Sequence, residues 1–363
     1  MTPARERLQR LLALTRSVLP PEPGARTELC RRWAAGTGLS PEGVAAALAC
    51  CLELEPSEAE LAALESQSST AARAHVILPG QVFVAAHRAL ALALAASPEV
   101  YVKPSRRDGT LIAALAARAD GLFQCVEQLP VQRGDHVWAY GADVTLEALR
   151  RQLPAGAVLH AHGTGFGVAV IAASGSAERR AAQAVALARD TALFDQRGCL
   201  SPRLVLVSGD GAAAFAAAQQ LAELLCGALA QLGTTLPRGQ LSPDEHAEES
   251  WYRQCVACFA PLLDSGQGTV SVRDVSASEL ASAAALLLPP VGRHLQVIPV
   301  AQLEPALLSL APWLTSVSCD DAALRCRLEA LLPRARVCEL GRMQSPAFDG
   351  PVDRRPTPAG EVI

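Results

Sequence analysis

The sequence has almost no lysine. Lys103 is the only lysine among 32 basic residues, so arginine supplies the positive charge everywhere else. A compact ammonium with three donors fits positions that the planar guanidinium of arginine does not. The bias therefore indicates that Lys103 stands where an ammonium is needed, and chance retention on a surface loop is the alternative.

Net charge and long apolar runs are also lacking. The formal net charge of −4 at pH 7 excludes a general attraction to nucleic acid or anionic membranes. We find no charged-then-apolar leader and no apolar run long enough to span a bilayer, so we expect a soluble, cytoplasmic protein. Aromatic residues make up only 4% of the chain, which favours aliphatic walls in a substrate pocket.

The cysteines do not form a disulfide framework. There are 11 of them, an odd number at irregular spacing, so we expect most to be small buried residues of a cytosolic chain. Cys255 and Cys258 make one CxxC pair, and His160 and His162 alternate along one predicted strand. Neither pair has the further ligands that a zinc site needs, so we predict no metal.

Short apolar runs alternate with amphipathic stretches over most of the chain. From residue 74 onward, strands such as EVYVK and HVWAY alternate with helices, which predicts an α/β fold with parallel sheets. A chain of 363 residues is long enough for two domains. We predict an N-terminal helical region (1–70), a cofactor-binding domain (71–193), a catalytic domain (194–340) and a C-terminal tail (341–363).

Ligands of open α/β sheets bind outside the carboxyl ends of the strands. In EVYVKPSRRD, Lys103 ends a predicted strand, and Ser105, Arg106 and Arg107 follow, a set suited to ribose hydroxyls and a phosphate. Gly141 lies between a strand and a helix whose N-terminus attracts an anion such as pyrophosphate. The alternatives are a solvated basic turn and an ordinary strand-to-helix turn.

Cys199 lies on a polar turn, FDQRGCLSPR, between a predicted helix and a predicted strand. Gly198 permits close approach to the backbone, and Pro202 stiffens the exit from the turn. Backbone N–H groups or the guanidinium of Arg197 would favour the reactive thiolate. These features favour a nucleophile, and a structural cysteine is the alternative.

Several segments together resemble the acyl-CoA reductases of the LuxC type. These enzymes supply fatty aldehyde in bacterial bioluminescence and belong to the aldehyde dehydrogenase superfamily. The matching segments are VKPSRRD, AYGADVTLEALRRQLP, FDQRGCLSPRLVLV, HLQVIP and RVCELGRMQSPAFDG. The resemblance implies a Rossmann-like parallel-sheet cofactor domain and a second α/β catalytic domain. It also implies that Cys199 attacks an acyl thioester, that Lys103 and Ser105 hold the adenosine ribose, and that Gly141 faces the pyrophosphate.

Three positions depart from the pattern of the superfamily. Arg106 stands where many NAD-using relatives have a glutamate that binds the 2′-hydroxyl, so we expect a preference for NADPH. The segment HAHGTGFG has no carboxylate where hydrolytic relatives have a general base, so the acyl-enzyme should survive until it is reduced. Gln81 stands near the position of an oxyanion-stabilising asparagine, and His294 is a candidate acid or substrate contact.

The sequence thus predicts an NADPH-dependent fatty acyl-CoA or acyl-carrier-protein reductase that forms a homo-oligomer. Its predicted catalytic residues are Cys199, Gln81 and His294. One alternative is a reductase of short or aminoacyl thioesters in secondary metabolism, which a chain-length profile would reveal. The other is a weakly catalytic partner of an acyl-activating enzyme, which turnover by the isolated chain would exclude.

Overall fold

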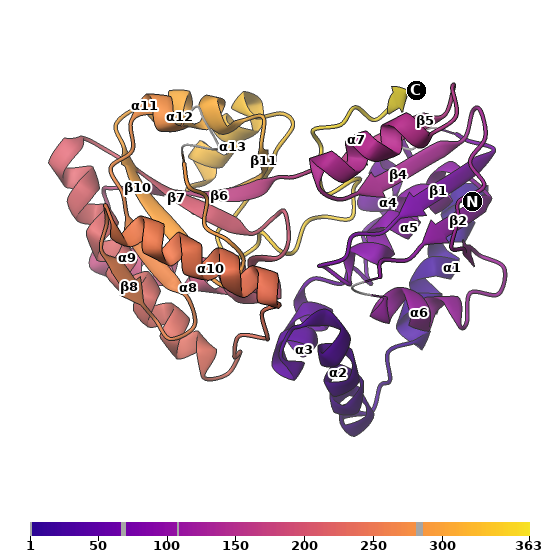
Figure 1. Cartoon of the computed structure of the whole chain (residues 1–363), viewed down its shortest axis with the longest axis horizontal. Coiled ribbons are helices and arrows are strands. Elements are labelled where there is room, and N and C mark those ends of the chain that lie inside the picture. The colour runs from indigo at the N-terminus through magenta and orange to yellow at the C-terminus, as the bar shows by residue number, and fades with distance from the viewer. Residues whose placement is uncertain (1, 67–69, 107–108, 281–285) are drawn as a thin grey trace. The chain divides into compact units, whose positions relative to one another are not determined.

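The computed structural model of the chain describes residues 2–66, 70–106, 109–280 and 286–363 (Figure 1). By their internal contacts these residues form two compact units. The first unit comprises Met1–Thr37, Ala47–Thr164 and Ala347–Ile363, and the second comprises Gly38–Ala46 and Gly165–Pro346. Each unit is built on its own sheet.

The sheet of the first unit has six strands among the described residues, in the order β13-β5-β4-β1-β2-β3. Strands β1 to β5 are parallel, and β13 joins the edge as an antiparallel strand. The order β3-β2-β1-β4-β5 is that of the Rossmann fold, with its switch point between β1 and β4. The strands are β1 (Arg73–Ile77), β2 (Glu99–Lys103), β3 (Gln124–Cys125), β4 (His136–Tyr140), β5 (Val158–His162) and β13 (Glu361–Val362).

Helices cover both faces of this first sheet. Helix α5 is apolar on nearly every side and is buried, because it lies between the sheet and helices α1 and α4. Helix α7 packs Leu146 against Val137 and Leu159 on the opposite face. The helices of this unit are α1 (Pro3–Ser17), α2 (Pro23–Thr37), α4 (Glu58–Ser66), α5 (Ala85–Ala96), α6 (Thr110–Ala116) and α7 (Asp143–Gln152), and α3 (Pro41–Cys50) runs from the second unit into the first.

The sheet of the second unit has seven strands among the described residues, in the order β12-β11-β6-β7-β10-β9-β8. All neighbours are parallel except the edge strand β8. Its strands are β6 (Phe166–Ala172), β7 (Pro202–Ser208), β8 (Leu262–Asp264), β9 (Thr269–Val272), β10 (Leu295–Val300), β11 (Leu314–Cys319) and β12 (Arg336–Cys338). Its helices are α8 (Ala177–Ala192), the 3-10 helix η1 (Leu193–Gln196), α9 (Gly211–Gly233), α10 (Pro243–Ala257), α11 (Ala277–Leu280), α12 (Leu303–Leu310) and α13 (Ala322–Leu331).

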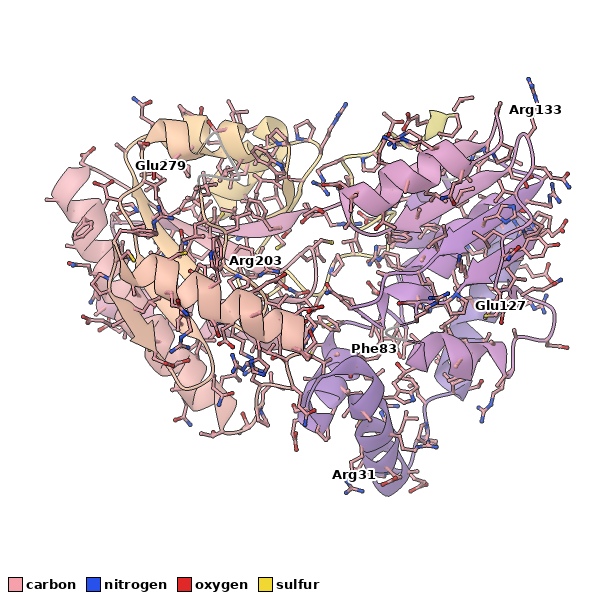
Figure 2. All side chains as sticks on the ribbon, in the orientation of Figure 1. Arg31, Phe83, Glu127, Arg133, Arg203 and Glu279 are labelled. Carbon is pink, nitrogen blue, oxygen red and sulfur yellow. The ribbon has the colours of Figure 1, made fainter. Side chains whose placement is uncertain are left out.

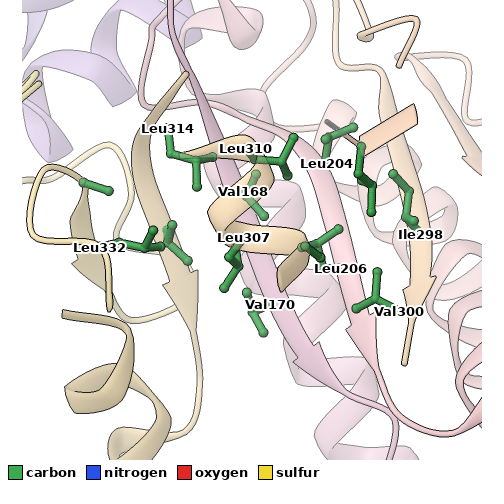
Figure 3. Packing of buried hydrophobic residues seen from close by; sticks show 14 of the residues in the cluster. Val168, Val170, Leu204, Leu206, Ile298, Val300, Leu307, Leu310, Leu314 and Leu332 are labelled. Atoms are coloured by element: carbon green, nitrogen blue, oxygen red, sulfur yellow. The ribbon is translucent and has the colours of Figure 1, made fainter. Parts of the chain in front are cut away.

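Successive strand residues of the second sheet point to opposite layers of helices. On one face, Ile171 and Val205 pack against α8 and α9. On the other face, Val168, Leu204 and Ile298 pack against Leu307 and Leu310 of α12 (Figure 3). These are fully buried apolar strands, as expected of a parallel sheet covered on both sides.

Two predicted boundaries are wrong. The division lies at residues 164 and 165 rather than near 193, because β6 pairs with β7 and β11 and α8 packs on the same sheet. The tail is not merely extended, because β13 pairs with β5 and Arg355 donates to the carbonyl oxygens of Gly163 and Thr164. Residues 347–363 therefore belong to the first unit.

The expectation that no apolar run is long enough to span a membrane is also wrong for α9. Among the described residues, α9 has the length and composition to do so. Its apolar face, which includes Leu221 and Leu225, is buried against the second sheet. Packing of this kind is that of a core helix.

Candidate functional site

The predicted cofactor residues lie at the carboxyl ends of the parallel strands of the first sheet. Lys103 is the last residue of β2, Ser105 and Arg106 follow it, and Gly141 directly follows β4. Ile77 at the end of β1 pairs in register with both Lys103 and Ala139, so the ends of these strands are level. Lys103 and Arg106 are exposed to solvent. Arg107 lies outside the described residues.

The start of α7 forms the other side of this switch point. The Gly141 N–H donates to the His162 carbonyl at 3.2 Å, and Ala142 at the N-cap provides no side-chain cap. The start of the helix thus keeps N–H donors that could hold an anion, and Lys103 and Arg106 are exposed cations at the end of β2. The Asp143 carboxylate opposes an anion there, but its Oδ1 accepts from the Thr164 N–H at 2.9 Å.

Gln81 is half-buried in the loop that joins β1 to α5. Mostly apolar side chains line a small cavity beside this loop in the first unit, among them Phe83, which precedes α5 and is labelled in Figure 2. The cavity is lined by Leu78, Pro79, Val82, Phe83, Ala86, Thr110, Leu111 and Ile112. The loop therefore combines a side-chain amide with an apolar surface.

Cys199 is half-buried at the amino ends of the strands of the second sheet, in the turn between η1 and β7. The segment η1, which leads into this turn, has an uncommon backbone conformation and is called the left-handed turn below. Phe194, Asp195 and Gln196 have φ angles of 57°, 49° and 62°, although none of them is glycine. The left-handed conformation costs an L-residue about 1–2 kcal/mol, so the surrounding structure must hold it.

Buried polar contacts hold this left-handed turn. The Asp195 carboxylate accepts from Arg293 Nε at 2.7 Å and from the Gly239 N–H at 2.9 Å. The Asp195 carbonyl accepts from the Gly292 N–H at 2.9 Å. Because the ion pair with Arg293 is buried and also hydrogen-bonded, breaking it would leave an uncompensated charge in the core.

The three residues Cys199 to Ser201, which follow the left-handed turn, are held by hydrogen bonds to their carbonyl oxygens. Thr315 Oγ1 donates to the Cys199 carbonyl, and Ser316 Oγ donates to the Leu200 carbonyl at 3.0 Å. The Gly167 N–H donates to the Ser201 carbonyl at 2.9 Å. These three carbonyls therefore point toward β11 and β6, and the conformation of the Cys199 turn is set by both strands.

The GRMQSP stretch packs onto the same turn. Asp190 of α8 accepts the N–H groups of Gly341 at 2.7 Å and Met343 at 3.0 Å, and Gln344 Nε2 donates to Ser201 Oγ at 2.9 Å. Burial raises the pKa of Asp190 to about 7, although the two N–H groups oppose the rise. The two segments most specific to the predicted family are thus in contact.

The predicted role of Arg197 in favouring the thiolate is not supported. Its guanidinium is buried and donates to both carboxylate oxygens of Glu245, at 3.0 and 3.1 Å, and to the Gln240 carbonyl at 2.9 Å. Glu245 also forms a capping box with Ser242 at the start of α10. The charge of Arg197 therefore pairs with Glu245 at the start of α10 and, at 3.4 Å, with Asp195 Oδ2 in the left-handed turn.

His294 is fully buried, so its ring does not reach solvent or a substrate. Its Nδ1 lies 2.8 Å from Thr269 Oγ1, and its Nε2 lies 3.2 Å from Glu249 Oε1. Burial lowers its pKa, and the Glu249 carboxylate opposes that shift only in part. The predicted role as an acid or substrate contact lacks the access it requires, whereas the backbone of His294 binds the side chain of Gln196.

His160 and His162 pack as neutral aromatic rings. His160 stacks on Trp138 with ring centres 4.3 Å apart, and His162 stacks on Tyr140 at 4.6 Å. Burial lowers the pKa of His160 to about 3 and that of His162 to about 4. Across the residues that the structure describes, no group of three or more His, Cys, Asp or Glu side chains is arranged to hold a metal ion.

Sequence reasoning missed the residues that support Cys199. Gln196, Thr315 and Asp190 contact the Cys199 turn or the GRMQSP stretch, but they lie in ordinary helix and strand patterns. The signal available for Gln196 was its place in FDQRGC, three residues before the thiol. Nothing in the local pattern of Thr315 or Asp190 distinguishes them.

The fold of the chain is similar to that of known oxidoreductases. An oxidoreductase from Marinobacter aquaeolei matches with a TM-score of 0.67 and 13% identity, covering 99% of this chain and 85% of that one. An NAD-dependent benzaldehyde dehydrogenase from Corynebacterium glutamicum matches with a TM-score of 0.68 and 14% identity, covering 94% of this chain and 82% of that one. The fold is therefore that of the aldehyde dehydrogenases, and the predicted fold class is confirmed.

The sequence model of the LuxC acyl-CoA reductases matches residues 120–353, and no curated protein sequence matches significantly. The chain belongs to the LuxC acyl-CoA reductase family and is an oxidoreductase, as the resemblance implied. Family and fold together support reduction of an acyl thioester to an aldehyde.

Proposed function

We propose that this chain reduces an acyl-CoA or acyl-carrier-protein thioester to an aldehyde, with NADPH, through a covalent thioester on Cys199. The observation that carries the proposal is the left-handed turn before Cys199. Three non-glycine residues in this conformation are a strained feature of the kind that clusters at active sites. The thiol that follows them is half-buried rather than sealed in the core.

The chemistry at Cys199 is acyl transfer followed by release. The Cys199 thiolate attacks the acyl carbon, the bond to the carrier sulfur breaks, and the carrier leaves as a thiolate that takes a proton from water. After hydride addition to the cysteine-bound acyl carbon, the bond to Cys199 breaks and the aldehyde departs. The side-chain amide of Gln81 is the proposed donor to the oxyanion in both stages.

The cofactor assignment rests on the residues at the carboxyl ends of β2 and β4 in the first sheet. Lys103 and Ser105 would bind the adenosine ribose, Gly141 and the start of α7 would face the pyrophosphate, and Arg106 would pair with a 2′-phosphate. When bound, the reduced nicotinamide supplies the hydride. Among structural neighbours, one is described as NAD-dependent and another as an NAD⁺ complex, which supports a nicotinamide dinucleotide here.

Intact-mass measurement after mixing with acyl-CoA, without NADPH, tests the proposal. The wild-type chain should gain the mass of one acyl group, and Cys199→Ala should gain none. Cys258→Ala is the matched control, because Cys258 is an exposed cysteine of the same unit and should not be needed. Acyl addition to Cys199→Ala, or none to the wild type, would overturn the covalent mechanism. A series of chain lengths in the same assay separates fatty from short substrates.

A further inference from the structure

The side chain of Gln196 closes the loop that carries Cys199. Its Nε2 donates to the Pro202 carbonyl at 2.8 Å and to the His294 carbonyl at 2.6 Å. Its Oε1 accepts from the His294 N–H at 2.5 Å. Pro202 begins β7 and His294 directly precedes β10, so one amide joins both ends of the Cys199 loop and ties them to the neighbouring strand.

The backbone of Gln196 is held as well as its side chain. Gln196 is fully buried with a φ of 62°, and its carbonyl accepts from Arg203 Nη2 at 2.9 Å (Arg203 is labelled in Figure 2). An L-residue in this conformation gains by returning to a right-handed one, which would rotate the chain that follows. The side-chain hydrogen bonds of Gln196 oppose that rotation directly.

We propose that Gln196 is a positioning residue for Cys199. Its amide keeps the loop from Gln196 to Pro202 in the conformation that aims the Cys199 thiol at the acyl carbon. This inference rests on the proposed nucleophilic role of Cys199. The effect passes through the backbone, because the contacts of the amide are with Pro202 and His294.

A purely structural role would make Gln196 equivalent to any other buried glutamine of the same unit. Gln296 on β10 is such a residue, and it is also fully buried. Its Nε2 donates to the Leu287 carbonyl at 2.8 Å and to Tyr252 Oη at 3.4 Å, and its Oε1 accepts from Arg273 Nη1 at 3.2 Å. In each of Gln196→Met and Gln296→Met a buried amide that donates two hydrogen bonds and accepts one is lost, but only the first change affects the Cys199 loop.

The experiment compares Gln196→Met, Gln296→Met and the wild-type chain. The rate of acylation by acyl-CoA is followed by intact mass, the rate of Cys199 alkylation by iodoacetamide by peptide mass, and stability by thermal unfolding. We expect acylation to slow about 100-fold in Gln196→Met, the scale of a misplaced reacting group, and less than about threefold in Gln296→Met. Thermal stability should fall by similar amounts in both variants.

If Gln196→Met does not fold, Gln196→Asn serves in its place, because its amide is one methylene shorter and does not span both partners. Acylation at the wild-type rate in the Gln196 variant, or equal slowing in the Gln296 variant, would overturn the positioning role. Failure of the proposed function looks different: the wild type would not be acylated, or Cys199→Ala would be, whatever the Gln196 variant does.

Discussion

Replacement of Gly167 by alanine tests how closely the Cys199 turn is packed. An added Cβ at Gly167 would lie 2.4 Å from Met343 Cε, 2.5 Å from the Leu200 carbonyl oxygen and 2.7 Å from Ser316 Oγ. The end of the Met343 side chain can move aside, because it is flexible. The Leu200 carbonyl is backbone and is held by Ser316, so the turn itself must shift by about 0.9 Å to bring this contact from 2.5 Å to the 3.4 Å at which ordinary contact begins.

The expected cost has two parts. Overpacking of this kind destabilises by about 1–3 kcal/mol. A shift of the backbone next to Cys199 should also slow acylation by roughly 10- to 100-fold, because misplacement of reacting groups is costly. Gly227→Ala is the control, since an added Cβ there meets nothing within 4 Å, and alanine should stabilise α9 by about 1 kcal/mol.

Urea unfolding and the intact-mass acylation rate measure both parts. The double variant Gly167→Ala/Met343→Ala should not recover the acylation rate, because the contact with the Leu200 carbonyl remains. If Gly167→Ala kept wild-type stability and acylation, the close packing of this turn against β6 would be refuted. If the double variant recovered the rate, Met343 rather than the turn would be responsible.

The remaining predictions concern pH and the cofactor. Because burial raises the folded-state pKa of Asp190 to about 7, the folded chain retains a proton that the unfolded chain releases near pH 4, so stability should fall as pH rises between these values. Between pH 5 and pH 8, the unfolding free energy of Asp190→Asn should fall by about 2–3 kcal/mol less than that of the wild type. An equal fall in both proteins would count against this assignment. Arg106→Glu should raise the KM for NADPH about tenfold or more while changing that for NADH little. Arg133→Glu is the control, because Arg133 is exposed before β4, at the opposite edge of the same sheet (Figure 2); equal effects of the two changes would refute the role of Arg106.

The local patterns of the sequence were enough for most elements. The strands EVYVK and HVWAY appear as predicted, because each depends on neighbouring residues alone. The order of the strands and the division into two units could not be predicted from the sequence. An apolar strand such as β6 carries no mark of which sheet it joins, and this is why the break was placed after α8 instead of before β6.

The site was predictable only in part. Cys199 stood out because a glycine-flanked polar turn is an unusual place for a thiol, and the resemblance added its role. The role of Gln196 could not be predicted, because its hydrogen-bond partner His294 lies 98 residues away in the sequence. Asp190 was missed for the same reason, since the Met343 N–H that it accepts is 153 residues away. Contacts of this kind exist only after the chain has folded.

The most direct test of the account is a single turnover of the acylated chain. The wild-type chain is first acylated with acyl-CoA, freed of excess substrate, and then mixed with NADPH while mass and aldehyde are followed. The account predicts that one equivalent of aldehyde forms as the acyl mass leaves Cys199, and that the acyl group persists when NADPH is omitted. An acyl group that stays on Cys199 after NADPH is added, while added acyl-CoA is still reduced, would contradict it.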